Sequence, residues 1–353
     1  MADKTIRIGI VGAGGIVRQR HVPGLRKVAG VELAAVCNST PESTASAAQE
    51  YAIPRQFNDW HELVQWDGID AVVVGTPPYQ HREISCAALA AGKHVFCQAR
   101  MAMDYADARQ MYACAQATDR TSMLCPPPHY MYGDRVVQRL LREGFVGKPL
   151  NVVVRAYGAP YLDPNAPLHW RQIGRISGIN TLDVGMMIEV TQRWLGYAKT
   201  VVAQTQTVYP ERTTEGGGRG KVDRPDALSA IATLENGALA TYLWSGVARN
   251  AGTNFIEIYG TDGTLRYEVA SAVDLGHLYG ATGADRELRE IPIPDDEARP
   301  WAAEADFIQA IREGRSGSPS FHDGLKYMEM TEAIFRSAEQ GRVIDLAQEF
   351  GNE

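Results

Sequence analysis

The sequence has no surplus of basic residues, and this lack restricts the partners that it can have. Its 353 residues include 35 Lys and Arg against 42 Asp and Glu, which gives a formal net charge of −7. Such a balance argues against nucleic acid or an anionic membrane as a partner. The sequence also lacks an apolar run near the ~20 residues of a membrane span, and a basic-then-apolar signal at its start. We therefore expect a cytoplasmic protein whose partner is a small-molecule substrate.

Cysteine is scarce and lacks the spacing of a metal site. The five cysteines are scattered and odd in number: Cys37, Cys86, Cys97, Cys114 and Cys125. Most of them lie in apolar strand or helix patterns. This placement predicts reduced thiols in the core and no metal centre.

The glycines after the first apolar strand indicate a nucleotide-binding turn. The strand and turn occupy Ile8–Ile16, and an amphipathic stretch, Arg18–Lys27, follows. Gly12 permits a tight turn and Gly14 lets the backbone approach a pyrophosphate, while the helix N-terminus supplies N–H groups. The third small position of this pattern is Val17, which should push helix and strand slightly apart. The residues assigned to the pyrophosphate are Gly12, Gly14, Gly15 and Ile16.

Strands and helices alternate over the first 125 residues. The expected strands after the glycine turn are Val31–Asn38, Ala71–Gly75, His94–Cys97 and Ser122–Cys125. The expected helices between them are Pro41–Tyr51, His81–Ala91 and Tyr105–Ala117. This alternation predicts an α/β Rossmann domain, residues 1–125, with a doubly wound parallel sheet and a ligand at the carboxyl ends of its strands. Three consecutive prolines, residues 126–128, mark the boundary.

Residues 126–353 predict a second domain of the α+β class. The expected strands are longer and alternate in polarity: Leu150–Tyr157, Thr200–Tyr209, Ala227–Glu235, Ala238–Ser245 and Asn254–Tyr259. Asn236-Gly237 is a strong hairpin signal between two of them. We expect a large, mainly antiparallel open sheet and a mobile loop at residues 216–220. The expected helices are Gly133–Glu143, Leu182–Leu195, Ala302–Glu313 and Gly324–Gly341.

The helices are expected to cover one face of that sheet and to leave the other open. Residues such as Val153, Tyr242 and Trp244 could then line a broad apolar face. A monomer rarely exposes an apolar patch beyond a few hundred Å², so pairing of two such faces would give a homodimer or homotetramer. The alternative is that these side chains point into the core of the monomer, because strand periodicity alone does not fix the face.

Short motifs in a fixed order extend over nearly the whole chain. They are Val11-Gly-Ala-Gly-Gly-Ile, Thr76-Pro-Pro-Tyr-Gln-His81, Ala91-Gly-Lys-His-Val-Phe-Cys97, Leu182-Asp-Val-Gly185, Arg193-Trp-Leu-Gly196, Tyr259-Gly-Thr-Asp-Gly-Thr-Leu265 and Phe321-His-Asp-Gly324. In these motifs the chain resembles the glucose–fructose oxidoreductase / inositol dehydrogenase family (Gfo/Idh/MocA). The resemblance implies a Rossmann domain that binds NAD or NADP, an oligomer-forming second domain, and sugars, polyols or related cyclic compounds as substrates. The residues assigned to the cofactor in or beside these motifs are Thr76, Pro77, His81 and Gln98.

Two residues of the family's usual acid–base chemistry are replaced in this chain. The family usually has Glu-Lys-Pro where this chain has Gln98-Ala99-Arg100, and the lysine binds the reacting hydroxyl. Four residues after Asp183 the family usually has a histidine, and here that position is Met187. Three functions therefore remain open. They are an NAD(P)-dependent oxidoreductase, a lyase, hydrolase or isomerase with a tightly bound nicotinamide used transiently, and a catalytically silent cofactor-binding protein.

Hydride transfer at an alcohol carbon needs a group that takes the hydroxyl proton. Asp183 and His129 are candidates for this role, whereas Arg100 could hold an oxyanion but could not act as a base. Each has a structural alternative: a carboxylate satisfied at a helix N-terminus, a histidine satisfied between domains, and a surface or phosphate-contacting arginine. The residues assigned to the substrate are His169 and Trp170, in a loop, and Met187, which is also typical of packing.

The end of the second strand bears on the choice between NAD and NADP. An acidic residue there would bind the ribose 2′-OH and repel a 2′-phosphate. The chain has Asn38-Ser39-Thr40 instead, which favours NADP over NAD. The alternative is a plain turn at the strand end. Possible phosphate partners are Arg18, Arg20 and Arg55.

Overall fold

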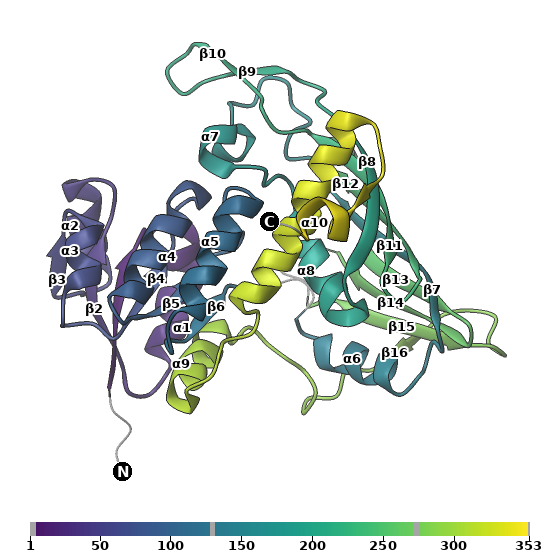
Figure 1. Ribbon diagram of the computed structural model, residues 1–353, viewed down its shortest axis with the longest axis horizontal. Helices are drawn as coiled ribbons and strands as arrows, with labels where there is room; N and C mark the ends of the chain where they lie inside the picture. The colour runs from purple at the N-terminus through teal and green to yellow at the C-terminus, as the bar shows by residue number, and fades with distance from the viewer. Residues whose placement is uncertain (1–4, 128–130, 271–274, 352–353) are drawn as a thin grey trace. The chain divides into compact units, whose positions relative to one another are not determined.

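The computed structural model describes residues 5–127, 131–270 and 275–351 (Figure 1). Contacts within the chain form two compact units. One contains Met1–Pro126 with Ala302–Leu325, and the other contains Pro127–Trp301 with Lys326–Glu353. The segment Ala302–Leu325 thus groups with the N-terminal sheet, which the order of the sequence did not indicate.

The first unit is built on a six-stranded sheet of order β3-β2-β1-β4-β5-β6, in which every pair is parallel. The strands are β1 (Ile6–Val11), β2 (Val31–Cys37), β3 (Arg55–Phe57), β4 (Ala71–Val74), β5 (His94–Cys97) and β6 (Ser122–Leu124). The predicted doubly wound parallel sheet is confirmed. The chain winds outward in one direction from β1 and in the other from β4, and ligands bind at the carboxyl ends of strands at such a switch point.

The helices of this unit begin at polar caps that the sequence supplies. They are α1 (Val22–Arg26), α2 (Pro41–Glu50), α3 (Trp60–Gln65), α4 (His81–Ala90), α5 (Tyr105–Gln116) and α9 (Ala303–Glu313), with a short 3-10 turn η2 (Pro78–Gln80). Thr40, Asp59 and Asp104 each accept a backbone N–H at the start of a helix, which satisfies groups that the helix itself leaves open.

The expected helix Arg18–Lys27 is divided in the structure. A π-helical segment η1 (Val17–His21) precedes α1, and the backbone N–H of Val22 donates to the carbonyl of Val17. Pro23 has no N–H to donate, which removes an ordinary helical bond at this point. Wide helical turns of this kind frequently occur at functional sites.

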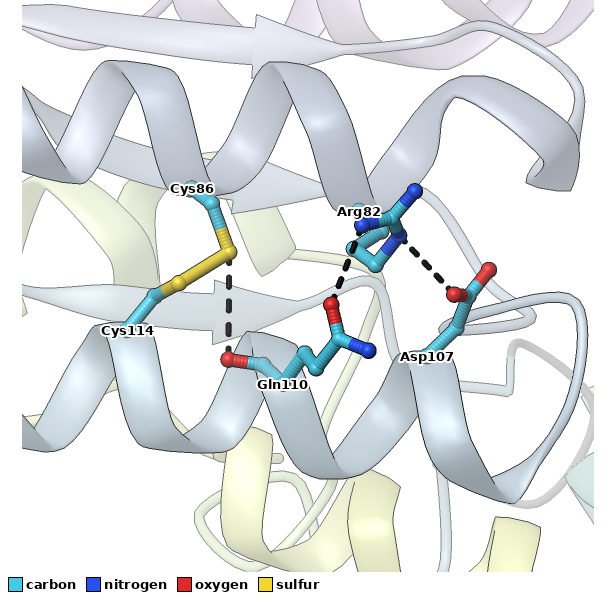
Figure 2. The surroundings of a disulfide bond; sticks show 5 residues. All are labelled: Arg82, Cys86, Asp107, Gln110 and Cys114. Carbon is cyan, nitrogen blue, oxygen red and sulfur yellow. Dashed lines mark hydrogen bonds and ion pairs between the residues drawn. A yellow bond between two sulfur atoms is a disulfide. The ribbon is translucent and has the colours of Figure 1, made fainter.

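The prediction of five reduced thiols is wrong for two of the cysteines. Cys86 of α4 and Cys114 of α5 form a disulfide (Figure 2). Arg82 also joins these two helices through Gln110 and Asp107. The pairing depends on which faces of two packed helices meet, and sequence spacing does not reveal this. Cys37, Cys97 and Cys125 are buried free thiols, as expected.

The second unit contains a nine-stranded sheet of order β16-β15-β14-β13-β7-β12-β11-β8-β17. Its strands are β7 (Pro149–Tyr157), β8 (Ala198–Gln206), β11 (Ala227–Leu234), β12 (Leu239–Ser245), β13 (Asn254–Gly260), β14 (Gly263–Val269), β15 (His277–Thr282), β16 (Arg289–Ile291) and β17 (Ile344–Asp345). Only the β7–β12 pair is parallel among its described pairs. The predicted mainly antiparallel sheet is therefore confirmed.

A small hairpin lies outside this sheet and corrects one expectation. Strands β9 (Glu211–Thr213) and β10 (Arg219–Lys221) pair antiparallel. Arg219 and Gly220, expected in a mobile loop, therefore belong to β10. Their pairing was missed because a three-residue strand rich in Gly and charge has no strand pattern.

Helices cover one face of the large sheet (Figure 1). The helices and turns of this unit are α6 (Asp134–Arg142), η3 (Trp170–Gln172), α7 (Gly174–Ser177), α8 (Val184–Leu195) and α11 (Leu346–Phe350), with most of α10 (Phe321–Gln340). The Tyr242 hydroxyl and the Thr191 hydroxyl of α8 are 3.0 Å apart. The backbone N–H of Ala203 on β8 donates to the Ser337 hydroxyl of α10.

The placement of two aromatic residues on the open face is wrong. Tyr242 and Trp244 are each 1% exposed and lie on the helix-covered face. Successive side chains of a strand point to opposite faces, so the residues next to the buried ones lie on the other face. There Ile231 is 46%, Leu239 45% and Val202 37% exposed. Val153 is half-buried and belongs to this same row, because Val202 pairs with Ile231, Ile231 with Thr241, and Thr241 with Val153. The expected open face therefore exists, and of the three residues predicted for it only Val153 lies there.

Among the described helices, none has the length and apolar character needed to cross a membrane. The described residues also contain no group of three or more His, Cys, Asp or Glu side chains arranged to hold a metal ion.

Candidate functional site

A cavity of about 650 Å³ lies at the carboxyl ends of β1, β2 and β4, within the first unit. It occupies the switch point of the sheet, between β1 and β4. Of the residues assigned to the cofactor, six line it: Gly12, Gly14, Asn38, Ser39, Thr76 and Pro77. Five others lie outside its lining: Gly15, Ile16, Thr40, His81 and Gln98.

Glycine occupies positions 12 and 14 of the turn for different physical reasons. Gly12 has a φ of +87°, and a Cβ there would lie 2.6 Å from the backbone nitrogen of Thr76. The fold itself therefore requires glycine at position 12. A Cβ on Gly14 would meet no described atom within 4 Å, and Gly14 is exposed on the cavity. Packing gives no reason for glycine there, whereas a pyrophosphate seated against the backbone does. The turn therefore fits a dinucleotide.

The side chain of Val17 is accommodated by the glycine at position 75. Val17 is fully buried, and a Cβ on Gly75 would overlap both its side chain and the carbonyl of Gly12. Gly75 stands at the end of β4, so the missing Cβ makes room at the point where the turn approaches the sheet. The separation expected from Val17 is thus relieved at Gly75.

Asn38 supports the glycine turn with its side chain. Its Oδ1 accepts from the backbone N–H of Ala13 at 2.7 Å, and its Nδ2 donates to the carbonyl of Ser43 at 3.0 Å. Thr40 caps α2 by accepting from the N–H of Ser43. Both residues therefore hold local structure, and Ser39 is the exposed hydroxyl of this segment on the cavity.

Arg18 is the only one of the three candidate phosphate partners that lines the cavity. Its guanidinium lies 2.9 Å from the carboxylate of Glu50 and 3.3 Å from the hydroxyl of Tyr51, and its side chain is 62% exposed. Arg55 instead lies over the ring of Phe57. A single positive charge is thus held beside the segment that follows β2.

His81 supports the cavity wall from behind. It is fully buried, its Nε2 lies 2.7 Å from the carbonyl of Thr76, and its Nδ1 lies 3.0 Å from the carbonyl of Arg100. Burial lowers the pKa of His81, although these carbonyls oppose the effect. Through these two contacts the ring joins the loops that follow β4 and β5.

Gln98 follows β5 and contacts a buried pair of residues that the sequence did not single out. Its Oε1 lies 2.7 Å from Nε2 of His21, and Nδ1 of His21 lies 2.6 Å from Oε1 of Glu304. His21 and Glu304 are 283 positions apart, so no local pattern joins them. The available signal was a histidine at an apolar position of the helix after the glycine turn.

Arg100 is 5% exposed, so its alternative as a surface arginine is wrong. It follows Ala99, the position of the family's lysine, and its backbone carbonyl accepts from the buried ring of His81. A guanidinium just after β5 can offer N–H donors to an oxyanion.

Asp183 and Met187 lie one turn apart at the start of α8, in the second unit. Asp183 is half-buried at the N-cap, and its carbonyl accepts from the N–H of Met187 at 2.9 Å. Among the described residues, its carboxylate accepts no capping bond from the helix backbone. The alternative in which helix N–H groups satisfy this carboxylate is therefore wrong. Met187 is 4% exposed and packs in the core. His129 lies outside the described residues.

His169 and Trp170 form a small structured unit before α7. The Nδ1 of His169 accepts from the N–H of Arg171 at 3.2 Å, and the guanidinium of Arg171 lies 4.3 Å from the ring centre of Trp170. Gln172 anchors this segment by donating to the buried carboxylate of Asp226. Partial burial, followed by the charge of Arg171, lowers the pKa of His169. The ring is therefore neutral at pH 7, with its proton on Nε2.

The switch-point cavity and the open glycine turn together indicate a protein of the dinucleotide-binding class. Comparison with known proteins then gives the family. The description "Oxidoreductase family, NAD-binding Rossmann fold" matches residues 6–124, and "Oxidoreductase family, C-terminal alpha/beta domain" matches residues 138–346. The chain belongs to the Gfo/Idh/MocA family, as its motifs predicted. It is an oxidoreductase with an NAD-binding Rossmann domain.

Three relatives illustrate the family. Levoglucosan dehydrogenase of Pseudarthrobacter phenanthrenivorans is 28% identical over 89% of this chain and 89% of its own. D-apiose dehydrogenase of Paraburkholderia graminis is 26% identical over 97% of this chain and 90% of its own. The 1,5-anhydro-D-fructose reductase of Ensifer adhaerens is 26% identical over 96% of this chain and 98% of its own.

Solved structures share the fold along the whole chain. The apo form of levoglucosan dehydrogenase superposes with a TM-score of 0.88 at 24% identity and covers 97% of this chain and 98% of its own. An oxidoreductase domain protein from Kribbella flavida gives a TM-score of 0.86 at 25% identity, with 97% and 99% coverage.

Proposed function

We propose that this protein is a dehydrogenase that transfers a hydride between a nicotinamide dinucleotide and a hydroxyl-bearing carbon of a sugar or polyol. The open backbone at Gly14 carries the proposal, because it suits a pyrophosphate and has no use in packing. The names of the relatives support the substrate class, since levoglucosan, D-apiose and 1,5-anhydro-D-fructose are all sugars or anhydrosugars. One levoglucosan dehydrogenase has been solved with NADH and levoglucosan.

The proposed roles follow from what each side chain can do. The bound nicotinamide supplies the hydride acceptor or donor. Asp183 is the proposed base, because a half-buried carboxylate can take a hydroxyl proton. His129 is kept as the second candidate for this proton. Arg100 would hold negative charge on the reacting oxygen, and His169 with Trp170 would bind the sugar ring from their loop.

The proposal includes a modest preference for NADP over NAD. No carboxylate ends β2, and the charge of Arg18 lines the same cavity as Ser39. Asp59 also lines this cavity and opposes a 2′-phosphate, which limits the preference. Calorimetric titration with NADP+ and NAD+ measures it, and equal or tighter binding of NAD+ would contradict this part of the proposal.

The function is tested by cofactor turnover with a panel of anhydrosugars, pentoses and cyclic polyols. A dehydrogenase gives reduced nicotinamide in proportion to product. A lyase, hydrolase or isomerase, which the loss of the usual lysine and histidine keeps open, gives product without net reduction. A silent binding protein gives neither. Gly14→Asp should abolish dinucleotide binding by placing a charged side chain against the phosphates. Gly216→Asp, which adds the same side chain in open space on the exposed loop between β9 and β10, is the control.

We also propose that a second copy of the chain covers the open face of the large sheet. Ile231, Leu239 and Val202 are apolar and exposed there, and a soluble chain rarely leaves such a row uncovered. Two equal faces related by a twofold axis bury each other, which gives a homodimer or, by further pairing, a homotetramer.

A further inference from the structure

A buried hydrogen-bonded chain extends from α9 to the carboxyl end of β5 within the first unit. Glu304 Oε1 lies 2.6 Å from His21 Nδ1, and His21 Nε2 lies 2.7 Å from Gln98 Oε1. His21 is fully buried and Glu304 is 3% exposed, whereas Gln98 is half-buried. The chain thus begins in the core and ends at the edge of the sheet where ligands bind.

The acceptors of the two hydrogen bonds determine which ring nitrogens of His21 carry protons. A carboxylate and an amide oxygen can only accept, so the ring must donate from both of its nitrogens. A ring that donates from both nitrogens is an imidazolium, paired with Glu304. Burial alone lowers the pKa of His21, but hydrogen bonds to Cys125 and Glu304 outweigh it and raise the pKa to about 10.

The surrounding structure holds this pair in one geometry. The His21 ring lies edge-on to Phe96 at 5.1 Å, and Phe96 in turn packs against Phe307 of α9 at 5.5 Å. Gly24 gives the carboxylate its space, because a Cβ at this position would overlap the carboxyl group of Glu304. A ring between fixed walls cannot turn to offer Gln98 a different atom.

The position of Gln98 in the sheet indicates what its amide can reach. The turn after β1 and the segment after β2 line the cavity, and they would hold the pyrophosphate and the adenosine of a dinucleotide. A dinucleotide bound along the carboxyl edge of the sheet would continue over β4 and β5, and the residues that follow these strands would hold its nicotinamide half. Gln98 directly follows β5, where its N–H donates to the carbonyl of Val74 on β4.

We propose that the His21–Glu304 pair is a positioning device that binds the amide oxygen of Gln98 and thereby directs its NH2 group to donate to the nicotinamide half of the bound dinucleotide. This inference rests on the proposed function. Without the charge on His21, the amide could turn and present its oxygen, which would lose the donor. Gln98 is the residue that touches the cofactor, and His21 and Glu304 act through it.

A double-mutant cycle in dinucleotide binding tests the device. NAD+ and NADP+ are titrated calorimetrically into wild type, Gln98→Ala, Glu304→Gln and the double variant. Each single variant should weaken binding by roughly three- to tenfold, the effect of one hydrogen bond. The double variant should bind no more weakly than Gln98→Ala, because Glu304 acts only through Gln98. Effects that multiply, or a Glu304→Gln variant with normal affinity, would overturn the proposal.

A second measurement reads the ring directly and needs no variant to fold. Nitrogen-15 NMR of the histidine side chains at pH 8 should show both nitrogens of His21 protonated in wild type. A neutral ring would overturn the device by itself. In Glu304→Gln the ring should lose one proton. The titrations distinguish failure of the proposed function from failure of the positioning role. If wild type binds neither dinucleotide, both ideas are overturned. If wild type binds normally and the variants have independent effects, only the positioning role is overturned.

Discussion

At the scale of single residues, some residues line the cavity and others shape it through hydrogen bonds to the backbone, and Asn38 does both. Gly14, Ser39 and Arg18 line the cavity. Asn38 and His81, predicted from the sequence as cofactor ligands, spend their hydrogen bonds on the backbone that shapes it. The sequence located segments that line or support this cavity, but it could not show which side-chain atoms were already bonded to the backbone.

The buried ion pair predicts a pH dependence of stability. The pKa of His21 is raised from 6.5 in an open chain to about 10 in the folded protein. Because the pKa of His21 is higher in the folded protein than in the unfolded chain, protonation of His21 stabilises the folded state. This contribution is fully present below pH 6.5 and is lost as the pH rises through about 10. The free energy of unfolding should therefore fall by on the order of a few kcal/mol between these limits.

Urea unfolding at pH 6.5 and pH 10 measures this change, with Glu304→Gln as the comparison. The variant lacks the carboxylate that holds the proton, so its stability should change less across the same interval. Equal changes in wild type and variant would show that other groups cause the dependence.

At the scale of elements, α4 and α5 form a linked pair whose partnership the sequence did not reveal. The disulfide between Cys86 and Cys114 joins positions 28 residues apart. Arg82 adds an ion pair with Asp107 at 2.8 Å between the same helices (Figure 2). Covalent closure of such a loop restricts the unfolded chain, which stabilises the fold by about 3 kcal/mol in the chain-entropy treatment.

The disulfide predicts a stability that responds to reductant. Both cysteines are half-buried, so a thiol reagent can reach them. Treatment with reductant should lower the free energy of unfolding of wild type by about 2–4 kcal/mol. Cys86→Ser should start near the lower value and show no response. Denaturant titration with and without reductant decides the matter, and a wild type indifferent to reductant would contradict the linkage.

At the scale of the whole molecule, helices cover one face of the large sheet, and we propose that a second copy of the chain covers the other. This open face is lined by Ile231, with Val202 on one side of it and Thr241 on the other. Light scattering at micromolar concentration should give a mass of at least twice the 38.6 kDa of the chain.

A charge on this face should separate the copies. Ile231→Arg buries a guanidinium in the proposed interface, so its mass should fall toward that of the monomer. Lys148→Arg, at an exposed position before β7, keeps the charge of wild type and serves as the control. A monomeric wild type would remove the proposal of a second copy.

The sequence by itself determined the class of fold and the nucleotide-binding turn. Period and polarity are local properties, so the alternation of apolar strands and helices up to Cys125 and the glycines after β1 could be read along the chain. The hairpin at Asn236-Gly237 was equally local.

Only the tertiary structure decided the contacts between distant segments. It paired Cys86 with Cys114, joined His21 to Glu304, and turned Trp244 into the core while Ile231 faced outward. Side chains of a strand alternate between two faces, and the sequence alone does not show which face is buried. Two residues 283 positions apart form no local sequence pattern that would indicate their contact. The physical reason is that these choices depend on which surfaces meet after the chain has folded.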